Sequence, residues 1–175
     1  MTFLELQGKI KTPLFTVLDA AKYFPKDSAD LIRIQLHRFI KKGYLREIKR
    51  GLYQFSDRET DEFFLANTIY EPSYVSLESA LNYWGIIPDI PAGGVTSVSP
   101  VTTKEFSTTA GRFFYHKLDK KLFWGYGLAP FRMAFPEKAL LDYTYLRGEK
   151  AARGLRVDWS KIDQVKYKKF AEFYD

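Results

Sequence analysis

The stretch HRFIKKGYLREIKRGLYQF, residues 37–55, decides how the first third of the chain is organised. A helical pattern ends at Gly43, and glycine suits the left-handed conformation that closes many helices. The segments 45–49 and 52–55 then read as two short strands, and Arg50-Gly51 between them suits a tight turn. The sequence therefore predicts a basic helix followed directly by a basic two-stranded hairpin.

Two short helices and the start of the basic helix are predicted upstream of this stretch. Thr2 and Thr16 can each cap a short helix, and Pro25 stops the second because proline cannot continue the hydrogen-bond ladder. Asp27 or Ser28 then opens the third helix, which runs to Gly43. The predicted order is helix, helix, basic helix and basic hairpin.

The third helix has two different faces when its residues are placed at about 100° intervals. The apolar face gathers Ala29, Ile32, Leu36, Phe39 and Ile40. The opposite face carries Asp30, Arg33, Ile34, His37, Arg38 and Lys41. We expect the first face to pack on a core and the second to remain exposed.

The positive charge of the chain is concentrated at its N-terminal end. Residues 1–57 contain eleven Lys and Arg against six Asp and Glu, which accounts for +5 of the total net charge of +6. Residues 31–50 alone hold seven basic side chains and one acidic side chain, a density that attracts polyanions. Together with the element order, this pattern predicts a winged helix-turn-helix over 1–57 that binds double-stranded DNA.

The predicted DNA-binding residues come from the third helix and from the hairpin, the wing of such a domain. They are Ser28, Asp30, Arg33, Ile34, His37, Arg38, Lys41 and Lys42 from the helix, and Arg46, Lys49 and Arg50 from the hairpin. The apolar Ile34 can contact a thymine methyl group, or it can pack against a partner subunit. His37 is either a donor to a base or phosphate, or an ordinary surface histidine.

A second, α+β domain is predicted over 62–175, after the polar stretch 57–62. Helical patterns occur within 63–70, 74–84 and 163–175, and short β-rich pieces between 95 and 135 predict a small, largely antiparallel sheet. Pro136 can begin a further helix whose buried side is supplied by Leu140, Leu141 and Tyr145. Most of the central aromatic residues are expected in the core, with an exposed interaction patch as the alternative for some of them: Tyr83, Trp84, Phe113, Phe114, Tyr115, Phe123, Trp124 and Tyr126.

This second domain shows no recognisable catalytic, metal or cofactor site. His116 has no ligand partner at useful spacing and is expected on the surface or across a strand pair. Glu137 and Asp142 do not share a helix face, so solvation or structural pairing is expected for each. Residues 93–94 and 125–127 lack the signatures of dinucleotide or phosphate loops. We therefore expect no enzyme, although a perturbed polar cluster in a cleft would favour one.

The composition narrows cellular context as well as chemistry. The chain has no cysteine, which excludes disulfides, thiol nucleophiles and cysteine-ligated metal sites. No apolar run approaches the roughly 18 residues of a membrane-spanning helix. Glu5, Gln7 and Lys9 interrupt the N-terminal segment where a signal peptide would be apolar. We expect a cytoplasmic protein without a membrane partner.

Several longer segments carry a resemblance to a known family. YVSLESALNYWGIIPD at 74–89, VTSVSPVTTKEFSTTAGRFFYHKL at 95–118 and PEKALLDYTYL at 136–146 join the stretch at 37–55 in this likeness. Together they resemble the AbiEi-like antitoxins of type IV abortive-infection toxin–antitoxin systems. This chain ends at Tyr174-Asp175, before the longer helical ending expected of the family.

The resemblance implies a fold and a function. Such proteins carry an N-terminal winged helix-turn-helix that binds inverted repeats in the promoter of their own operon, and a second domain that counters a nucleotidyltransferase-like toxin without requiring a stable complex with it. By position, 28–42 would be the recognition helix and 46–51 the wing. The alternative is a winged helix-turn-helix transcriptional regulator with no toxin partner.

Overall fold

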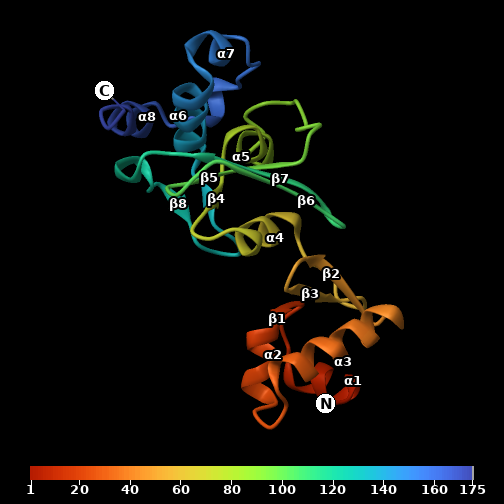
Figure 1. The fold of residues 1–175 in the computed structure, drawn as a ribbon. Coiled ribbons are helices and arrows are strands. Elements are labelled where there is room, and N and C mark those ends of the chain that lie inside the picture. Colours follow the sequence, from red (N-terminus) through yellow and green to blue (C-terminus); the bar gives the residue numbers. More distant parts are fainter. Residues whose placement is uncertain (175) are drawn as a thin grey trace. The chain divides into compact units, whose positions relative to one another are not determined.

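The computed structural model describes residues 1–174, which divide into two compact units (Figure 1). The N-terminal unit comprises Met1–Asp61 together with Thr108–Ala110, and the C-terminal unit comprises Glu62–Ser107 and the residues from Gly111 onward. The described residues form eight α-helices and two β-sheets, so the predicted α+β class is confirmed.

Three helices of the N-terminal unit begin where the sequence predicts them. They are α1 (Phe3–Lys9), α2 (Val17–Tyr23) and α3 (Ala29–Lys41). Thr2 and Thr16 each accept a backbone hydrogen bond and complete a capping box, while the Ser28 side chain accepts from the amide of Leu31. Of the two candidate caps for α3, Ser28 is the one used.

The hairpin of this unit belongs to a three-stranded antiparallel sheet. Its strands are β1 (Leu14–Thr16), β2 (Leu45–Lys49) and β3 (Leu52–Phe55), in the order β1-β3-β2. The two hairpin strands have the predicted bounds, and Gly51 takes the positive φ of 81° that their turn requires. Strand β1 was not predicted, because three residues are too few to show a strand pattern.

The apolar face of α3 packs into the core of the N-terminal unit, with one exception. Ile32, Leu36 and Phe39 are buried and Ile40 is half-buried, as the helical pattern predicts. Ala29 is exposed, because it lies at the first residue of the helix, where the chain enters from solvent.

The C-terminal unit combines five helices with a six-stranded sheet. The helices are α4 (Glu62–Ile69), α5 (Leu77–Tyr83), α6 (Pro136–Arg147), α7 (Glu149–Arg153) and α8 (Gln164–Ala171). In sheet order, the strands are β6 (Lys104–Thr108), β7 (Gly111–Lys117), β5 (Val95–Ser99), β4 (Tyr74–Val75), β9 (Met133–Ala134) and β8 (Tyr126–Gly127).

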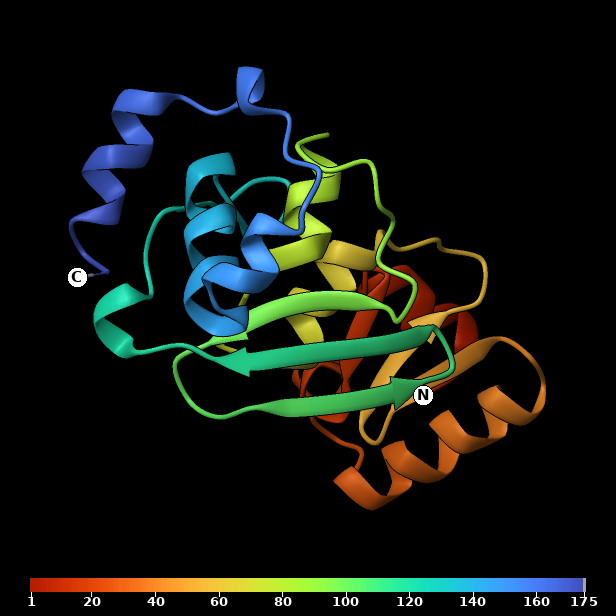
Figure 2. The ribbon, with the colours of Figure 1, turned by 90° about the horizontal axis from the view of Figure 1, so that it is seen from above.

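This sheet is mixed, so the prediction of a largely antiparallel sheet was wrong. Strand β5 pairs in parallel with β7, and β4 pairs in parallel with β9. The β4–β5 and β8–β9 pairs are antiparallel, and Figure 2 shows β6 and β7 running in opposite directions. Every residue of β5 is buried, as is common for a strand inside a parallel pair, and strand orientation leaves no other trace in a local pattern.

Helices cover both faces of the sheet. Figures 1 and 2 show α5 and α6 on one face and α4 on the other. The Tyr115 hydroxyl donates to the carbonyl of Ala66 in α4 at 2.6 Å, so the neighbouring side chains Phe114 and His116 lie on the face of α5 and α6.

Among the described residues, no helix combines the length and apolar character needed to cross a bilayer.

Two expectations about buried side chains need correction. Pro136 begins α6 and Leu140 and Leu141 are buried as predicted, but Tyr145 is exposed because the buried part of α6 runs only from Glu137 to Tyr143 and Tyr145 lies in the last turn. The expectation that most of the central aromatic residues lie in the core was wrong. Only Phe113 and Tyr115 of these residues are buried. Four are half-buried, namely Phe114, Phe123, Trp124 and Tyr126, and Tyr83 and Trp84 are exposed.

Candidate nucleic-acid interface

The face of α3 opposite the core is exposed along its whole length. All six residues predicted on this face are exposed, namely Asp30, Arg33, Ile34, His37, Arg38 and Lys41. Ile34 is 51% exposed, so this aliphatic side chain is accessible from solvent on the basic face. Lys42, at the C-cap of α3, extends the same basic surface.

The predicted hairpin residues differ in their exposure. Arg46 on β2 and Arg50 at the turn are exposed, whereas Lys49 is half-buried beside a bulge between Glu47 and Lys49. The pairing register shifts at this bulge, so that Lys49 pairs with Leu52. Lys49 is thus less accessible than the sequence pattern suggested.

A groove with a volume of about 890 Å³ lies between α3, the start of α2 and the hairpin. We call it the helix–hairpin groove. Three predicted residues meet in it: Arg33 and His37 from α3, and Arg50 from the turn. The other predicted residues do not line it. The complete lining is Thr16, Val17, Leu18, Arg33, His37, Glu47, Arg50, Gly51 and Tyr53.

The hairpin turn in this groove is held by a carboxylate. Glu47 Oε1 accepts a hydrogen bond from the backbone N–H of Gly51 at 3.0 Å. Gly51 is held in the positive-φ conformation that a side chain would strain. The turn that presents Arg50 is therefore fixed by its own strand.

Asp30 and Arg33 form an ion pair on the exposed face of α3. Arg33 Nη1 donates to Asp30 Oδ1 at 2.7 Å, and the two side chains remain 59% and 87% exposed. An exposed pair of this kind contributes about 0–1 kcal/mol, so Arg33 can exchange Asp30 for another acceptor at little cost. In the absence of a partner, Asp30 orients the Arg33 guanidinium.

The sequence did not single out the groove residues contributed by α2. Thr16 was assigned only as a helix cap, and Leu18 was placed inside the second helix without a role. Leu18 is 74% exposed, next to the buried Val17. The sequence did hold a signal for the exposure of Leu18. Val17 and Leu18 directly follow the Thr16 cap, and two adjacent residues of a helix cannot both face the core.

A buried polar cluster lies in the C-terminal unit, where no catalytic set was predicted. Lys138 and Asp142, one helical turn apart on α6, form an ion pair whose side chains are both fully buried. Asp142 Oδ2 also accepts from the hydroxyls of Tyr74 and Ser76, at 2.9 and 2.8 Å. We call these four residues, with Tyr174, the lysine–aspartate cluster.

Tyr174 closes this cluster from the end of the described chain. Its hydroxyl donates to Asp142 Oδ1 at 2.6 Å and accepts from Lys138 Nζ at 2.5 Å. Burial lowers the pKa of Lys138, an effect that the Asp142 carboxylate opposes. Burial and the nearby carboxylate raise the pKa values of Tyr74 and Tyr174, so both hydroxyls stay protonated.

Solvation or structural pairing was predicted for each of Glu137 and Asp142, and both form structural ion pairs. Glu137 is also buried, and it pairs with Lys166 of α8 at 2.9 Å while accepting from the amide of Asp163 at 3.0 Å. The two acids thus serve separate ion pairs. The lysine–aspartate cluster is polar and perturbed, as active sites often are, yet both of its charged side chains are inaccessible to a substrate in this conformation.

His116 lies on β7 beside Arg147, the last residue of α6, with Arg147 Nη2 3.2 Å from His116 Nε2. It lines a separate cavity of the C-terminal unit. Residues 1–174 contain no group of three or more His, Asp and Glu side chains placed to hold a metal ion.

Comparison with known proteins adds no family assignment. No family model matches this sequence, and no curated protein matches it.

Proposed function

We propose that the N-terminal unit is a winged helix-turn-helix that binds double-stranded DNA, and that the protein is the autorepressor and antitoxin of a type IV toxin–antitoxin system. In this role it recognises an inverted repeat in the promoter of its own operon. The toxin that it counters is a nucleotidyltransferase-like protein, and a stable complex between the two is not required. The resemblance of segments 37–55, 74–89 and 136–146 to AbiEi-like antitoxins supports the second part of the proposal.

One observation carries the DNA-binding part: the helix–hairpin groove brings basic residues of α3 and of the hairpin turn to one concave surface. In winged helix-turn-helix proteins the third helix enters the major groove while the hairpin follows the phosphate backbone. The exposed face of α3 offers Arg33 and Ile34 in the first half of the helix and His37 just past its midpoint, and these side chains would meet base edges. Arg46 and Arg50 extend from the hairpin, where phosphates are met.

These two settings predict different responses to mutation. Arg50→Ala should weaken binding to all DNA sequences alike and lower the magnitude of the log K against log salt slope by about 0.9, as one phosphate contact is lost. Arg33→Ala should cost about 1–3 kcal/mol on the operator and much less on random DNA, because a bidentate base contact is lost. Salt titrations of both variants on both DNAs measure these effects.

The opposite effects of the two substitutions would exchange the roles proposed for α3 and the hairpin. If Arg50→Ala relaxed sequence preference while Arg33→Ala changed only the salt slope, the hairpin would be reading bases and α3 would be contacting the backbone. The proposed docking of the N-terminal unit would then be wrong.

The Asp30–Arg33 pair predicts a loss of discrimination without a loss of affinity. In Asp30→Asn, the side chain no longer neutralises or orients Arg33, and one negative charge leaves the surface that faces the phosphates. We expect binding to random duplex to tighten by about 3- to 10-fold, with a smaller change on the operator, so that the ratio of the two affinities falls. Fluorescence anisotropy with both duplexes measures this ratio.

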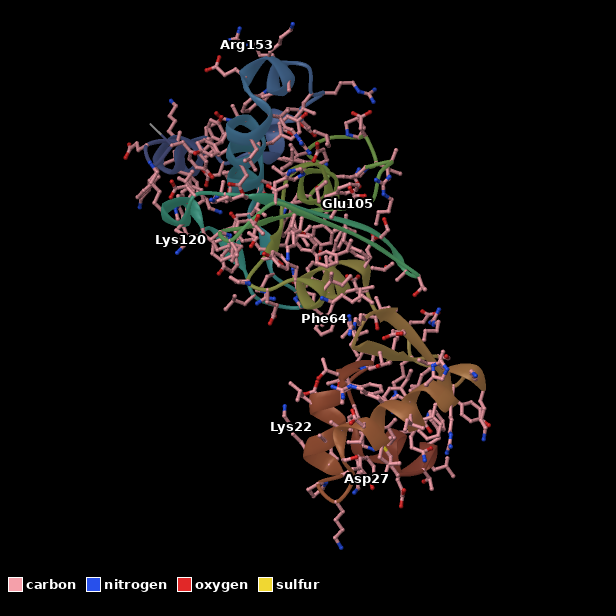
Figure 3. All side chains as sticks on the ribbon, in the orientation of Figure 1. Lys22, Asp27, Phe64, Glu105, Lys120 and Arg153 are labelled. Atoms are coloured by element: carbon pink, nitrogen blue, oxygen red, sulfur yellow. The ribbon has the colours of Figure 1, made fainter. Side chains whose placement is uncertain are left out.

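A matched control for this variant lies in the C-terminal unit. Glu149 on α7 forms a similarly exposed pair with Arg153, which extends into solvent in Figure 3. Glu149→Gln removes the same charge and should leave both affinities unchanged. If Glu149→Gln tightened binding to random duplex as much as Asp30→Asn does, the loss of one negative charge anywhere on the protein would explain the change. If Asp30→Asn alone weakened operator binding, Asp30 itself would contact a base.

The antitoxin part is tested by genetic context and by toxicity. A nucleotidyltransferase gene beside this one, whose product arrests growth unless this protein is co-expressed, is the expected finding. A neighbourhood without such a gene favours a transcriptional regulator with no toxin partner.

A further inference from the structure

A second site is built on the face of the C-terminal sheet that carries α5 and α6. It is a cavity of about 460 Å³, within the usual range of roughly 300–1,000 Å³ for small-molecule sites. Its charged or titratable lining comes from three elements: Glu78 on α5, His116 on β7 and Arg147 at the end of α6. The other lining residues are Pro91, Ala92, Gly93, Gly94, Thr96 and Phe114.

The charges in this cavity are balanced. Arg147 Nε and Nη2 both lie 3.3 Å from Glu78 Oε1, so the cation is paired with a carboxylate. Arginine has only donors, so the 3.2 Å contact between Arg147 Nη2 and His116 Nε2 requires Nε2 to accept and the ring to be neutral. Burial lowers the pKa of His116, and the neighbouring Arg147 lowers it further, which agrees with that neutral form. A neutral ligand suits such a site better than an anion does.

This cavity offers hydrogen-bonding groups to a ligand. Glu78 Oε2 is buried without a hydrogen-bond partner among the described residues, although buried acceptors are nearly always paired. Glu78 lines the cavity and its χ3 torsion is soft, so rotation about χ3 can bring this oxygen to a ligand there. The neutral His116 ring carries its proton on Nδ1, a further donor beside the guanidinium of Arg147. A ligand edge with an N–H donor next to an acceptor would match these groups.

One wall of the cavity is flat and apolar. Phe114 forms it, and the Arg112 guanidinium lies 5.0 Å from the centre of its ring. The loop opposite is held close by Gly94, whose φ is +130° and at which a Cβ atom would lie 2.2 Å from the carbonyl oxygen of Arg112. A Cβ atom at Gly93 would lie 3.5 Å from the Phe114 ring. The Arg112 guanidinium covers one face of this ring, so an aromatic ligand in the cavity would stack on the opposite face.

The residue before Glu78 is strained. Leu77 has a φ of 57°, in the left-handed region that residues with a side chain rarely adopt. Its neighbours on both sides make specific polar contacts, Ser76 with Asp142 and Glu78 with Arg147. Such strain persists where the surrounding structure fixes it and is frequent at binding sites.

We propose that this cavity binds a nucleobase, as a free base or a nucleoside, with its ring stacked on Phe114, an N–H donated to Glu78, and a ring nitrogen or carbonyl accepting from Arg147 or His116. The aromatic wall, the unpaired acceptor and the balanced charge together select a neutral, planar ligand with both donors and acceptors on one edge. The proposal does not rest on DNA binding by the N-terminal unit.

The test is a protein-observed NMR titration of the full chain with guanosine, adenosine, cytidine and uridine, and with ribose and inorganic phosphate as separate probes. We expect at least one nucleoside to bind with a Kd below about 1 mM and to shift the amide signals of residues 91–96 and 114–116. Glu78→Gln should weaken that binding at least 10-fold. Phe114→Leu, which keeps an apolar side chain but removes the ring, should weaken it about 3- to 10-fold.

Glu149→Gln is the control, since it removes an exposed carboxylate outside this cavity and should not alter the Kd. Thermal unfolding of each variant verifies that the C-terminal unit remains folded. The proposal is overturned if no nucleoside binds the wild-type chain at 5 mM, if ribose or phosphate binds as well as the nucleosides do, or if Glu78→Gln and Phe114→Leu both leave the Kd unchanged.

Discussion

Asp142→Ala should destabilise the C-terminal unit by about 3–5 kcal/mol, the largest effect expected of any single substitution considered for this protein. The variant leaves the fully buried Lys138 without its carboxylate partner, and the hydroxyls of Tyr74 and Ser76 without their acceptor. An unpaired buried charge costs far more than the net value of the ion pair, because the desolvation of the lysine is no longer offset.

Urea unfolding followed by tryptophan fluorescence measures this loss selectively. All three tryptophans, Trp84, Trp124 and Trp159, belong to the C-terminal unit, so the signal reports on that unit alone. Glu149→Ala, an exposed acid of the same unit, is the matched control and should change the free energy of unfolding by less than about 0.5 kcal/mol. A loss below about 1 kcal/mol for Asp142→Ala would show that the cluster is not the buried network described.

The pH dependence of the variant has a definite sign. Burial lowers the pKa of Lys138, and Asp142 is the group that opposes this effect. Without Asp142 the folded state holds the lysine proton less tightly than the unfolded state does, so the unfolded state binds more protons between the two pKa values. The free energy of unfolding of Asp142→Ala should therefore rise with pH toward the ordinary lysine pKa of about 10.4. Lys138→Met combined with Asp142→Asn should recover part of the loss at neutral pH, since no buried charge remains.

Local signals predicted the N-terminal unit well. The caps at Thr2, Thr16 and Ser28, and the glycines at 43 and 51, act within a few residues of themselves, so the bounds of α1 to α3 and of the hairpin strands follow from the sequence. Strand β1 exists only because it pairs with β3, some 38 residues further along the chain. That pairing leaves no trace in the three residues themselves.

The C-terminal unit shows where local reasoning stops. Lys138 and Asp142 stand at i and i+4, a spacing that usually marks an exposed helical ion pair. Their burial depends on Tyr74 and Tyr174, which are distant in sequence and reach the pair from other segments. The parallel pairing of β5 with β7, and the convergence of Glu78, His116 and Arg147, likewise depend on how distant elements pack.

The second large effect expected is sequence discrimination by the N-terminal unit. The exposed face of α3 combines charged, polar and aliphatic side chains, a mixture that can read base edges as well as phosphates. Two copies of this unit on one inverted repeat should contact half-sites separated by whole helical turns, as paired helix-turn-helix units do. Specific binders of this kind usually exceed their own non-specific affinity by about 10³-fold or more.

Promoter recognition is measured by the ratio of two dissociation constants, one for the duplex upstream of this gene and one for a random duplex of equal length. Gel shifts at roughly physiological salt give both values. If the N-terminal unit recognises its own promoter, the upstream duplex should bind at least about 10³-fold more tightly, and scrambling either half of its inverted repeat should remove most of this preference. Equal affinity for the two duplexes would mean that charge alone explains the binding and that the protein does not recognise its own promoter.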